Sequence, residues 1–282
     1  MKKALSLVAV APIVASLAGC GGTLETGVLT VGLECAYAPF NWTTSTPSDT
    51  SVSISNSGFL GIGASLCDGY DVQVAQHVAD ELGLTLRIRQ ISWDGLIPAL
   101  ESGTIDAIIA GMTDTAERRE KVNFTAPYYA SELVMLVRAD GEFTNATTIA
   151  DFSGANLAAQ LGTVQQDLLE ELAGDNNYTA SVPYETYPAA LQALLTASVG
   201  LDGVLAERPI AEEMLAAYPT QLALVEFYLD ETTYDPDWLI TVSVALRKED
   251  TQLQSDINAV LAALSPATRL EWMEAAIAAP KA

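Results

Sequence analysis

The sequence is poor in histidine and in basic residues. It contains one histidine, His77, and 13 lysines and arginines against 36 aspartates and glutamates, a formal net charge of −23 at pH 7. A surface this acidic repels nucleic acid phosphates and anionic lipid headgroups, so we expect no nucleic acid partner. With one histidine and no Cys/His cluster, we expect no zinc site and no cofactor.

Motifs of two common enzyme classes are also missing. No serine lies in a nucleophile-elbow motif, although residue counts alone leave Ser-His-Asp catalysis open. The glycine-rich stretch 58–63 does not stand between a strand and a helix of a βαβ unit, so it does not indicate dinucleotide binding.

No apolar run is long enough to span a bilayer comfortably. The apolar residues 4–18 follow Lys2 and Lys3 and are interrupted by two serines and a proline. A short positive segment before a short apolar run is typical of a secretory signal peptide. We therefore expect an exported chain whose later residues are soluble.

The signal-like segment ends in Leu17-Ala18-Gly19-Cys20. This ending resembles the lipobox of bacterial lipoproteins, which implies a signal peptide over residues 1–19 and lipidation of Cys20. Residues 20–28 would then be the lipidated cysteine and a short tether, and the protein would be extracytoplasmic and lipid-anchored to the bacterial cell membrane. The alternative is an ordinary secretory signal whose cleavage site precedes a cysteine.

Cysteine is scarce, with three in the chain. If Cys20 carries lipid, Cys35 and Cys67 remain, and they flank the Ser/Thr/Gly-rich stretch 43–65. A leftover pair in an exported protein is usually bridged. We expect a Cys35–Cys67 disulfide that stabilises the protein by about 3 kcal/mol on the chain-entropy model. The alternative is two free thiols, one of them buried.

The rest of the chain alternates between strand and helix patterns. Strands are expected at residues 29–33, 85–91, 105–110, 133–137, 156–161, 178–183, 201–206, 222–227 and 239–246, and helices at 70–82, 94–102, 164–172, 188–197, 209–217, 251–264 and 266–277. This order predicts two similar α/β halves with parallel pairing, and a small-molecule cleft where the halves face each other.

Several short motifs occur in a familiar order from about Leu29 to the C-terminus. They are Tyr37-Ala38-Pro39-Phe40, Gly69-Tyr70-Asp71-Val72, Ser92-Trp93-Asp94-Gly95-Leu96-Ile97-Pro98-Ala99-Leu100, Ser102-Gly103-Thr104-Ile105-Asp106, Gly111-Met112-Thr113-Asp114-Thr115-Ala116-Glu117-Arg118, Phe124-Thr125-Ala126-Pro127-Tyr128-Tyr129 and Arg247-Lys248-Glu249-Asp250. Together they resemble family 3 of the bacterial extracellular solute-binding proteins, the polar amino acid type.

The resemblance implies a two-lobed, type II periplasmic-binding-protein fold, in which two open α/β sheets are joined by two hinge strands. Lobe 1 would comprise residues 29–131 and 229–282, and lobe 2 residues 132–228. It also implies a monomer that is not an enzyme, but binds a free amino acid between its lobes and delivers it to the permease of an ABC importer.

A free amino acid brings a carboxylate and an ammonium into the cleft, and both need charged partners when they are buried. By the resemblance, Arg118 clamps the carboxylate, because a guanidinium offers two parallel donors. Thr113 would supply a hydroxyl, and Gly111 a backbone carbonyl facing the ammonium. From its charged surroundings alone, Arg118 would be interpreted as a surface residue that forms ion pairs on a helix.

Lobe 2 is expected to complete the site. Glu207 stands where the family usually has an aspartate that pairs with the ammonium; the alternative is an acid that favours a helix N-terminus. Gly162 and Thr163 match a loop whose backbone N–H groups bind the carboxylate. Val164 departs from the hydroxyl residue that often follows.

Aromatic and acidic residues are expected near the ligand's side chain. Tyr37 and Trp93 match the aromatic walls of the site, although each could simply pack in the core. Glu34 matches an acidic or small residue near that side chain. Two acids beside aromatics favour a cationic side chain, such as that of lysine, arginine, ornithine or histidine.

Two other functions fit the same scaffold. Cyclohexadienyl dehydratases resemble these binding proteins and use a cleft carboxylate as a proton donor, a role that Glu207 would permit. A ligand-sensing subunit of a membrane receptor is the other alternative.

Overall fold

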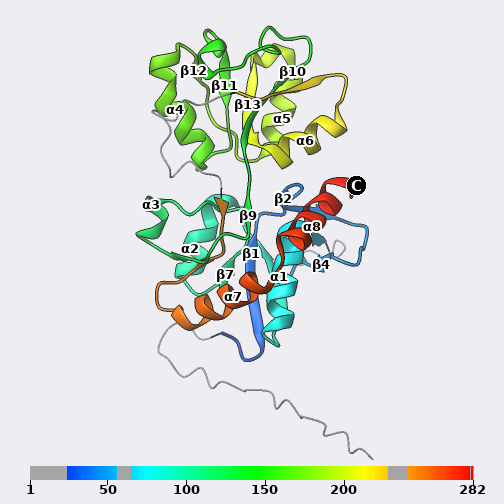
Figure 1. The fold of residues 1–282 in the computed structure, drawn as a ribbon, viewed down its shortest axis with the longest axis vertical. Helices are drawn as coiled ribbons and strands as arrows, with labels where there is room; N and C mark the ends of the chain where they lie inside the picture. The colour runs from blue at the N-terminus through cyan, green and yellow to red at the C-terminus, as the bar shows by residue number, and fades with distance from the viewer. Residues whose placement is uncertain (1–23, 56–64, 228–240, 280, 282) are drawn as a thin grey trace, which may run out of the picture.

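In the part of the chain that the structure describes, two five-stranded sheets form the framework of the molecule. The computed structural model describes residues 24–55, 65–227, 241–279 and 281. One sheet has the order β6-β1-β7-β16-β8 and the other β12-β11-β13-β10-β14. Figure 1 shows them as separate lobes, one above the other. The predicted α/β fold with two open sheets is therefore confirmed.

Lobe 1 is built around the sheet that contains β1. Its strands are β1 (Val28–Leu33), β6 (Thr85–Gln90), β7 (Ala107–Ile108), β8 (Asn123–Phe124) and β16 (Ala245–Leu246), and its helical elements are α1 (Tyr70–Glu81), η1 (Trp93–Gly95), α2 (Leu96–Glu101), α3 (Ala116–Arg119), α7 (Thr251–Ala263) and α8 (Pro266–Ala278). β1 pairs in parallel with β6 and β7, whereas β16 is antiparallel to β7 and β8. After its first residue β1 is buried throughout, as expected for a central strand covered on both faces.

Lobe 2 repeats this plan. Its strands are β10 (Leu133–Arg138), β11 (Asn156–Ala158), β12 (Thr179–Ala180), β13 (Gly203–Glu207) and β14 (Leu222–Val225), and its helical elements are η2 (Ile149–Phe152), α4 (Val164–Asn176), α5 (Tyr187–Leu195), η3 (Ala197–Val199) and α6 (Arg208–Ala217). β11 pairs in parallel with β12 and β13, and β10 runs antiparallel between β13 and β14. Each parallel strand therefore ends toward a helix N-terminus, where polar side chains can gather.

A pair of short strands joins the lobes. β9 (Tyr129–Ala130) leads into β10, and β15 (Thr241–Val242) pairs with it in antiparallel fashion before the chain enters β16. Figure 1 shows β9 at the junction between the lobes. The predicted lobe boundaries at residues 131/132 and 228/229 fall close to these strands and stay a prediction.

The lobes also meet through aromatic rings. Tyr37 of lobe 1 lies 5.3 Å from Tyr187 of lobe 2 and 5.3 Å from Phe40, measured between ring centroids. Phe40 in turn contacts Tyr70 and Tyr129 edge to face. Ring pairs of this kind add about 1 kcal/mol each beyond the area that they bury, so the lobes are held close beside the hinge strands.

The Ser/Thr/Gly-rich stretch contains more structure than the sequence predicts. A small antiparallel sheet has the order β2-β3-β5-β4, formed by β2 (Ala36–Tyr37), β3 (Asn41–Thr44), β4 (Val52–Ser53) and β5 (Leu66–Asp68). Cys35 and Cys67 are bridged, with their Cα atoms 5.7 Å apart. The expected disulfide is thus present, but the stretch is also held by backbone pairing. Residues 56–64 lie outside the described residues.

Other elements differ from expectation in detail. The apolar run 239–246 was expected as one strand, but its described part divides into β15 at the hinge and β16 in the lobe 1 sheet. Between them, Ser243 N donates to Met112 O and Val244 N to Thr125 Oγ1. The expected helix 94–102 begins instead as the 3₁₀ turn η1, which carries Trp93.

The predicted signal peptide and Cys20 lie outside the described residues. Within the described residues, no helix is both long and apolar enough to cross a membrane. Likewise, no group of three or more potential metal ligands gathers there.

We predict that replacing both Cys35 and Cys67 with serine lowers the free energy of unfolding by about 3 kcal/mol, because the open loop regains entropy in the unfolded chain. Urea unfolding at equilibrium would measure the change. Reducing the wild-type protein should reproduce it, whereas reductant should not affect the double variant. Equal stability of the oxidised and reduced wild-type protein would contradict the prediction.

Candidate functional site

A pocket lies between the lobes and is lined by both. Its volume is about 280 Å³, including space open to solvent, and its lining residues are Glu34, Tyr37, Trp93, Gly111, Thr113, Arg118, Gln160, Thr163, Val164, Gln165 and Glu207. Eight of the nine residues that the sequence predicts as ligand-binding are in this set. The ninth, Gly162, touches the site through its carbonyl group. Arg118 is the one basic residue among these described lining residues.

Arg118 points into the pocket from α3 in lobe 1. Its Nη1 donates to Thr113 O at 2.7 Å and its Nη2 to Gly162 O at 3.1 Å. The guanidinium also lies 5.3 Å from the ring centroid of Trp93. Burial lowers the pKa of Arg118 to about 10. Arg118 is thus a cleft cation whose charge is poorly hydrated, and not a surface partner of its acidic neighbours.

Glu207 is the last residue of β13 and enters the pocket from lobe 2. Its side chain is 1% exposed and does not cap α6. Oε1 accepts a hydrogen bond from Gln165 Nε2 at 3.2 Å, while Oε2 is buried with no hydrogen-bond partner among the described residues. Burial raises the pKa of Glu207 to about 7, although Tyr37, Gln165 and Arg118 act in the opposite direction.

A second acid, Glu34, follows β1 in lobe 1. Both of its carboxylate oxygens accept from Gln160 Nε2 of lobe 2 at 3.1 Å. The same amide nitrogen donates to Glu185 O at 3.0 Å, and Gln160 O accepts from Thr163 Oγ1 at 2.7 Å. Burial raises the pKa of Glu34 to about 7, Gln160 opposes the shift and Asp94 adds to it.

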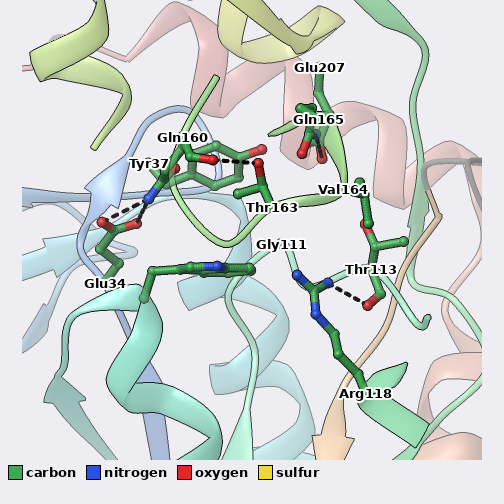
Figure 2. A pocket seen from close by; sticks show the side chains of 11 residues that line it. Glu34, Tyr37, Gly111, Thr113, Arg118, Gln160, Thr163, Val164, Gln165 and Glu207 are labelled. Atoms are coloured by element: carbon green, nitrogen blue, oxygen red, sulfur yellow. Dashed lines mark hydrogen bonds between the residues drawn. The ribbon is translucent and has the colours of Figure 1, made fainter. Parts of the chain in front are cut away.

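The two acids lie toward different ends of the pocket (Figure 2). Arg118 and Glu207 are on one side, and Glu34 with Gln160 is on the other. The Tyr37 side chain stands between these ends, and Trp93 also lines the pocket. The arrangement can therefore take a ligand with a carboxylate and an ammonium at one end and another polar group at the other.

Glycines let the backbone approach closely on both sides of the pocket. Gly111 has a φ of 66°, and a Cβ there would lie 2.7 Å from Tyr37 Cε1. Gly162 has a φ of 70°, and a Cβ would meet Asp94 and Trp93 of the opposite lobe. Both positions thus require a residue without a side chain.

Residues 162 and 163 lie in the connection from β11 to α4. Their polar groups bind other protein groups, whereas the sequence predicts that their N–H groups bind the ligand carboxylate. Gly162 N donates to Gln166 Oε1 at 2.8 Å, and Gly162 O accepts from Trp93 Nε1 at 2.9 Å. Thr163 is the N-cap of α4, where its hydroxyl accepts from Gln166 N. The donation of N–H groups to a ligand carboxylate stays a prediction for this loop.

Sequence reasoning missed Gln160 and Gln165, which are 2% and 3% exposed. They stand two residues before Gly162 and two residues after Thr163, at the end of a buried strand and in the first turn of a helix. A buried side-chain amide needs hydrogen-bond partners. The signal in the sequence that could have identified these residues is therefore the presence of two glutamines beside a loop that was already predicted to bind the ligand.

The family model of the bacterial extracellular solute-binding proteins, family 3, matches residues 63–274. The chain belongs to this family. Its extracytoplasmic location follows from that membership. The predicted family is therefore confirmed.

Relatives of this solute-binding protein include named amino acid binders. The chain is 31% identical over 194 residues to the putative ABC transporter arginine-binding protein 2 of Escherichia coli (strain K12), covering 68% of this chain and 74% of that protein. It is 29% identical over 241 residues to the L-cystine-binding protein TcyJ of the same strain, covering 84% and 77%.

A solved structure supports the fold assignment. It is the crystal structure of an amino acid ABC transporter substrate-binding protein from Streptococcus pneumoniae Canada MDR_19A bound to L-arginine. The solute-binding protein matches it with a TM-score of 0.74 and 26% identity, covering 92% of this chain and 97% of that one.

We predict that the unliganded protein is more stable at pH 5 than at pH 8. Glu34 and Glu207 change from an ordinary value of 4.5 in the unfolded chain, and Asp71 from 3.8, to a pKa of about 7 in the folded protein. The folded state therefore binds more protons between these values, and the free energy of unfolding falls by about 2.5 kcal/mol for each group between pH 5 and pH 8.

Denaturant unfolding of wild-type protein and a Glu207→Gln variant from pH 5 to pH 8 tests this. The variant should lose a share of the pH dependence, and a variant of the exposed Glu171, Glu171→Gln, should keep all of it. Stability that rises steadily toward pH 8 would refute the assignment.

Proposed function

We propose that this chain is the substrate-binding lipoprotein of an ABC importer and that it binds a basic amino acid between its lobes. The observation that carries the proposal is the charge pattern of the cleft. One cation, Arg118, is opposed by two buried acids, Glu207 and Glu34, toward different ends of the pocket.

The zwitterionic end of the ligand fits beside Arg118 and Glu207. Its carboxylate takes the guanidinium, which is the favoured partner for two parallel donor bonds. Its ammonium takes Glu207, whose Oε2 lacks a protein partner among the described residues. Each ligand charge is then paired on burial, which removes a penalty of several kcal/mol.

Glu34 selects the side chain. After the zwitterion has paired with Arg118 and Glu207, the Glu34 carboxylate still has, among the described residues, only the neutral amide of Gln160 as its hydrogen-bond donor. A guanidinium or ammonium on the ligand neutralises it, and the aromatic side chains of Trp93 and Tyr37 line the same pocket. The relative named as a putative arginine-binding protein and the solved structure bound to L-arginine agree with this choice.

Other ligand classes fit less well. A glutamate or aspartate ligand would bring a second carboxylate toward Glu34, and like charges repel. Cystine would bring a second ammonium but also a second carboxylate, for which the described lining offers no second arginine. Prephenate, the substrate of the dehydratase alternative, carries two carboxylates and meets the same obstacle.

We predict that L-arginine, L-lysine or L-ornithine binds more tightly than the neutral analogue L-citrulline, by about tenfold or more, because only a cationic side chain pairs with Glu34. A thermal-shift screen followed by calorimetry measures this. A ligand at 100 times its dissociation constant should add about 2.7 kcal/mol to the free energy of unfolding.

Matched variants assign the effect to its residues. Glu34→Gln should weaken arginine binding about 10- to 100-fold and change citrulline binding little. Arg118→Ala should abolish binding of both while the protein stays folded. Tighter binding of glutamate or cystine than of arginine would end the proposal of a basic ligand, and turnover of prephenate would favour the dehydratase.

The lipid anchor is proposed from the Leu17-Ala18-Gly19-Cys20 segment. Expression in a bacterium should give a membrane-bound protein whose mature N-terminus is acylated Cys20, as mass spectrometry would show. Cys20→Ala should abolish acylation and release the protein from membranes. An unmodified N-terminus on the wild-type protein would favour ordinary secretion.

A further inference from the structure

One buried carboxylate lies behind the pocket and does not line it. Asp71, in the first turn of α1, is 0% exposed. Its Oδ2 accepts a hydrogen bond from Asn41 Nδ2 at 2.8 Å, and its Oδ1 accepts one from the Tyr128 hydroxyl at 2.7 Å. Asn41 and Tyr128 are themselves fully buried.

Asn41 and Tyr128 each also accept a hydrogen bond, from the backbone of a segment that lines the pocket. Asn41 Oδ1 accepts from Cys35 N at 2.7 Å, and the Tyr128 hydroxyl oxygen accepts from Gly111 N at 3.0 Å. Cys35 lies directly after Glu34 and two residues before Tyr37, and Gly111 begins the segment that reaches Thr113. Asp71 thus connects two separate walls of the pocket through one intermediate residue on each side.

Both wall segments have backbone conformations that need support. Cys35 has a φ of 52°, in the left-handed region, which costs about 1 kcal/mol or more for a residue with a side chain. Gly111 also has a positive φ and lies against the Tyr37 ring. Small shifts of either segment would therefore move Glu34, Tyr37 or Thr113.

The direction of these hydrogen bonds depends on the charge of Asp71. Asp71 accepts through both oxygens, as an ionised carboxylate does; burial raises its pKa to about 7, and the hydrogen bonds from Tyr128 and Asn41 oppose that shift. It therefore turns the Asn41 amide so that its oxygen faces Cys35 N–H, and it takes the Tyr128 proton so that the phenol oxygen is free to accept from Gly111 N–H. An amide at position 71 could not receive both donors in this way.

We infer that Asp71 is a positioning residue for ligand binding, which sets the two lobe 1 walls through Asn41 and Tyr128 without touching the ligand. The inference rests on the proposed function, because its first test measures the affinity for the proposed ligand. It predicts that a change remote from the ligand weakens binding more than an equally destabilising change elsewhere in the core.

Tyr128→Phe is the decisive variant, because it removes the acceptor of Gly111 N–H and leaves the ring. The matched control is Tyr178→Phe in lobe 2, where a buried hydroxyl donates to Leu169 O at 2.7 Å. L-arginine binding by calorimetry should weaken about tenfold in Tyr128→Phe and stay unchanged in Tyr178→Phe. Asp71→Asn, which keeps the size of the side chain, should also weaken it.

Hydrogen exchange of the Gly111 amide, followed by NMR without ligand, gives a second measurement that does not depend on the ligand class. Exchange should speed up in Tyr128→Phe and not in Tyr178→Phe. If wild-type protein binds no arginine, the proposed basic ligand fails and the exchange measurement alone decides this inference.

Three results would overturn the positioning role. These are unchanged Gly111 exchange in Tyr128→Phe, wild-type arginine affinity in that variant, or an equal loss of affinity in Tyr178→Phe. If Asp71→Asn does not fold, the Tyr128→Phe measurements still decide.

Discussion

The cleft is organised by two buried acids and a partly buried cation. Ionised groups in such a place need partners, because the protein interior solvates charge poorly. The structure meets this need in part with neutral groups, namely the carbonyls of Thr113 and Gly162 for Arg118 and the amides of Gln165 and Gln160 for the acids. The zwitterion with a cationic side chain that we propose as ligand would satisfy the same groups with full charges, so that recognition and charge compensation would be one event.

This electrostatic arrangement exists only where the lobes meet. Arg118, Glu34 and Trp93 belong to lobe 1, whereas Glu207 and residues 160–165 belong to lobe 2. The direct bonds from Glu34 to Gln160 and from Trp93 to Gly162 cross the cleft. The hinge strands β9 and β15 and the ring contact between Tyr37 and Tyr187 lie beside it. The complete site therefore requires both lobes in this arrangement.

Much of this could be predicted from the sequence, for physical reasons. The long elements have strong apolar periodicity, and Glu207 ends one such strand, β13. Arg118 and Thr113 were supplied by the family resemblance, because the charged run around Arg118 alone indicates a surface residue. The small sheet around Cys67 could not be predicted, because its strands are short, rich in Ser and Thr, and stabilised by distant neighbours. The division of the run 239–246 could not be predicted, because both of its parts are buried and look alike in sequence. Val242 and Ala245 nevertheless belong to different sheets.

The roles of the glutamines were hidden for a different reason. Gln160 acts on Glu34, which is 126 positions away in the chain, and the contact joins one lobe to the other. Local patterns describe an element and its faces, not a partner on another lobe. The family resemblance supplied Glu34 and Glu207 but not the amides that hold them.

The position of the disulfide couples the Glu34 wall of the pocket to redox state. Cys35 immediately follows Glu34, and its bond to Cys67 fastens this turn to the small sheet β2-β3-β5-β4. Such a bond persists in oxidising compartments and not in the cytosol. In a reducing medium the turn keeps the hydrogen bond from Cys35 N to Asn41 Oδ1 but loses its covalent constraint, so Glu34 is held less firmly.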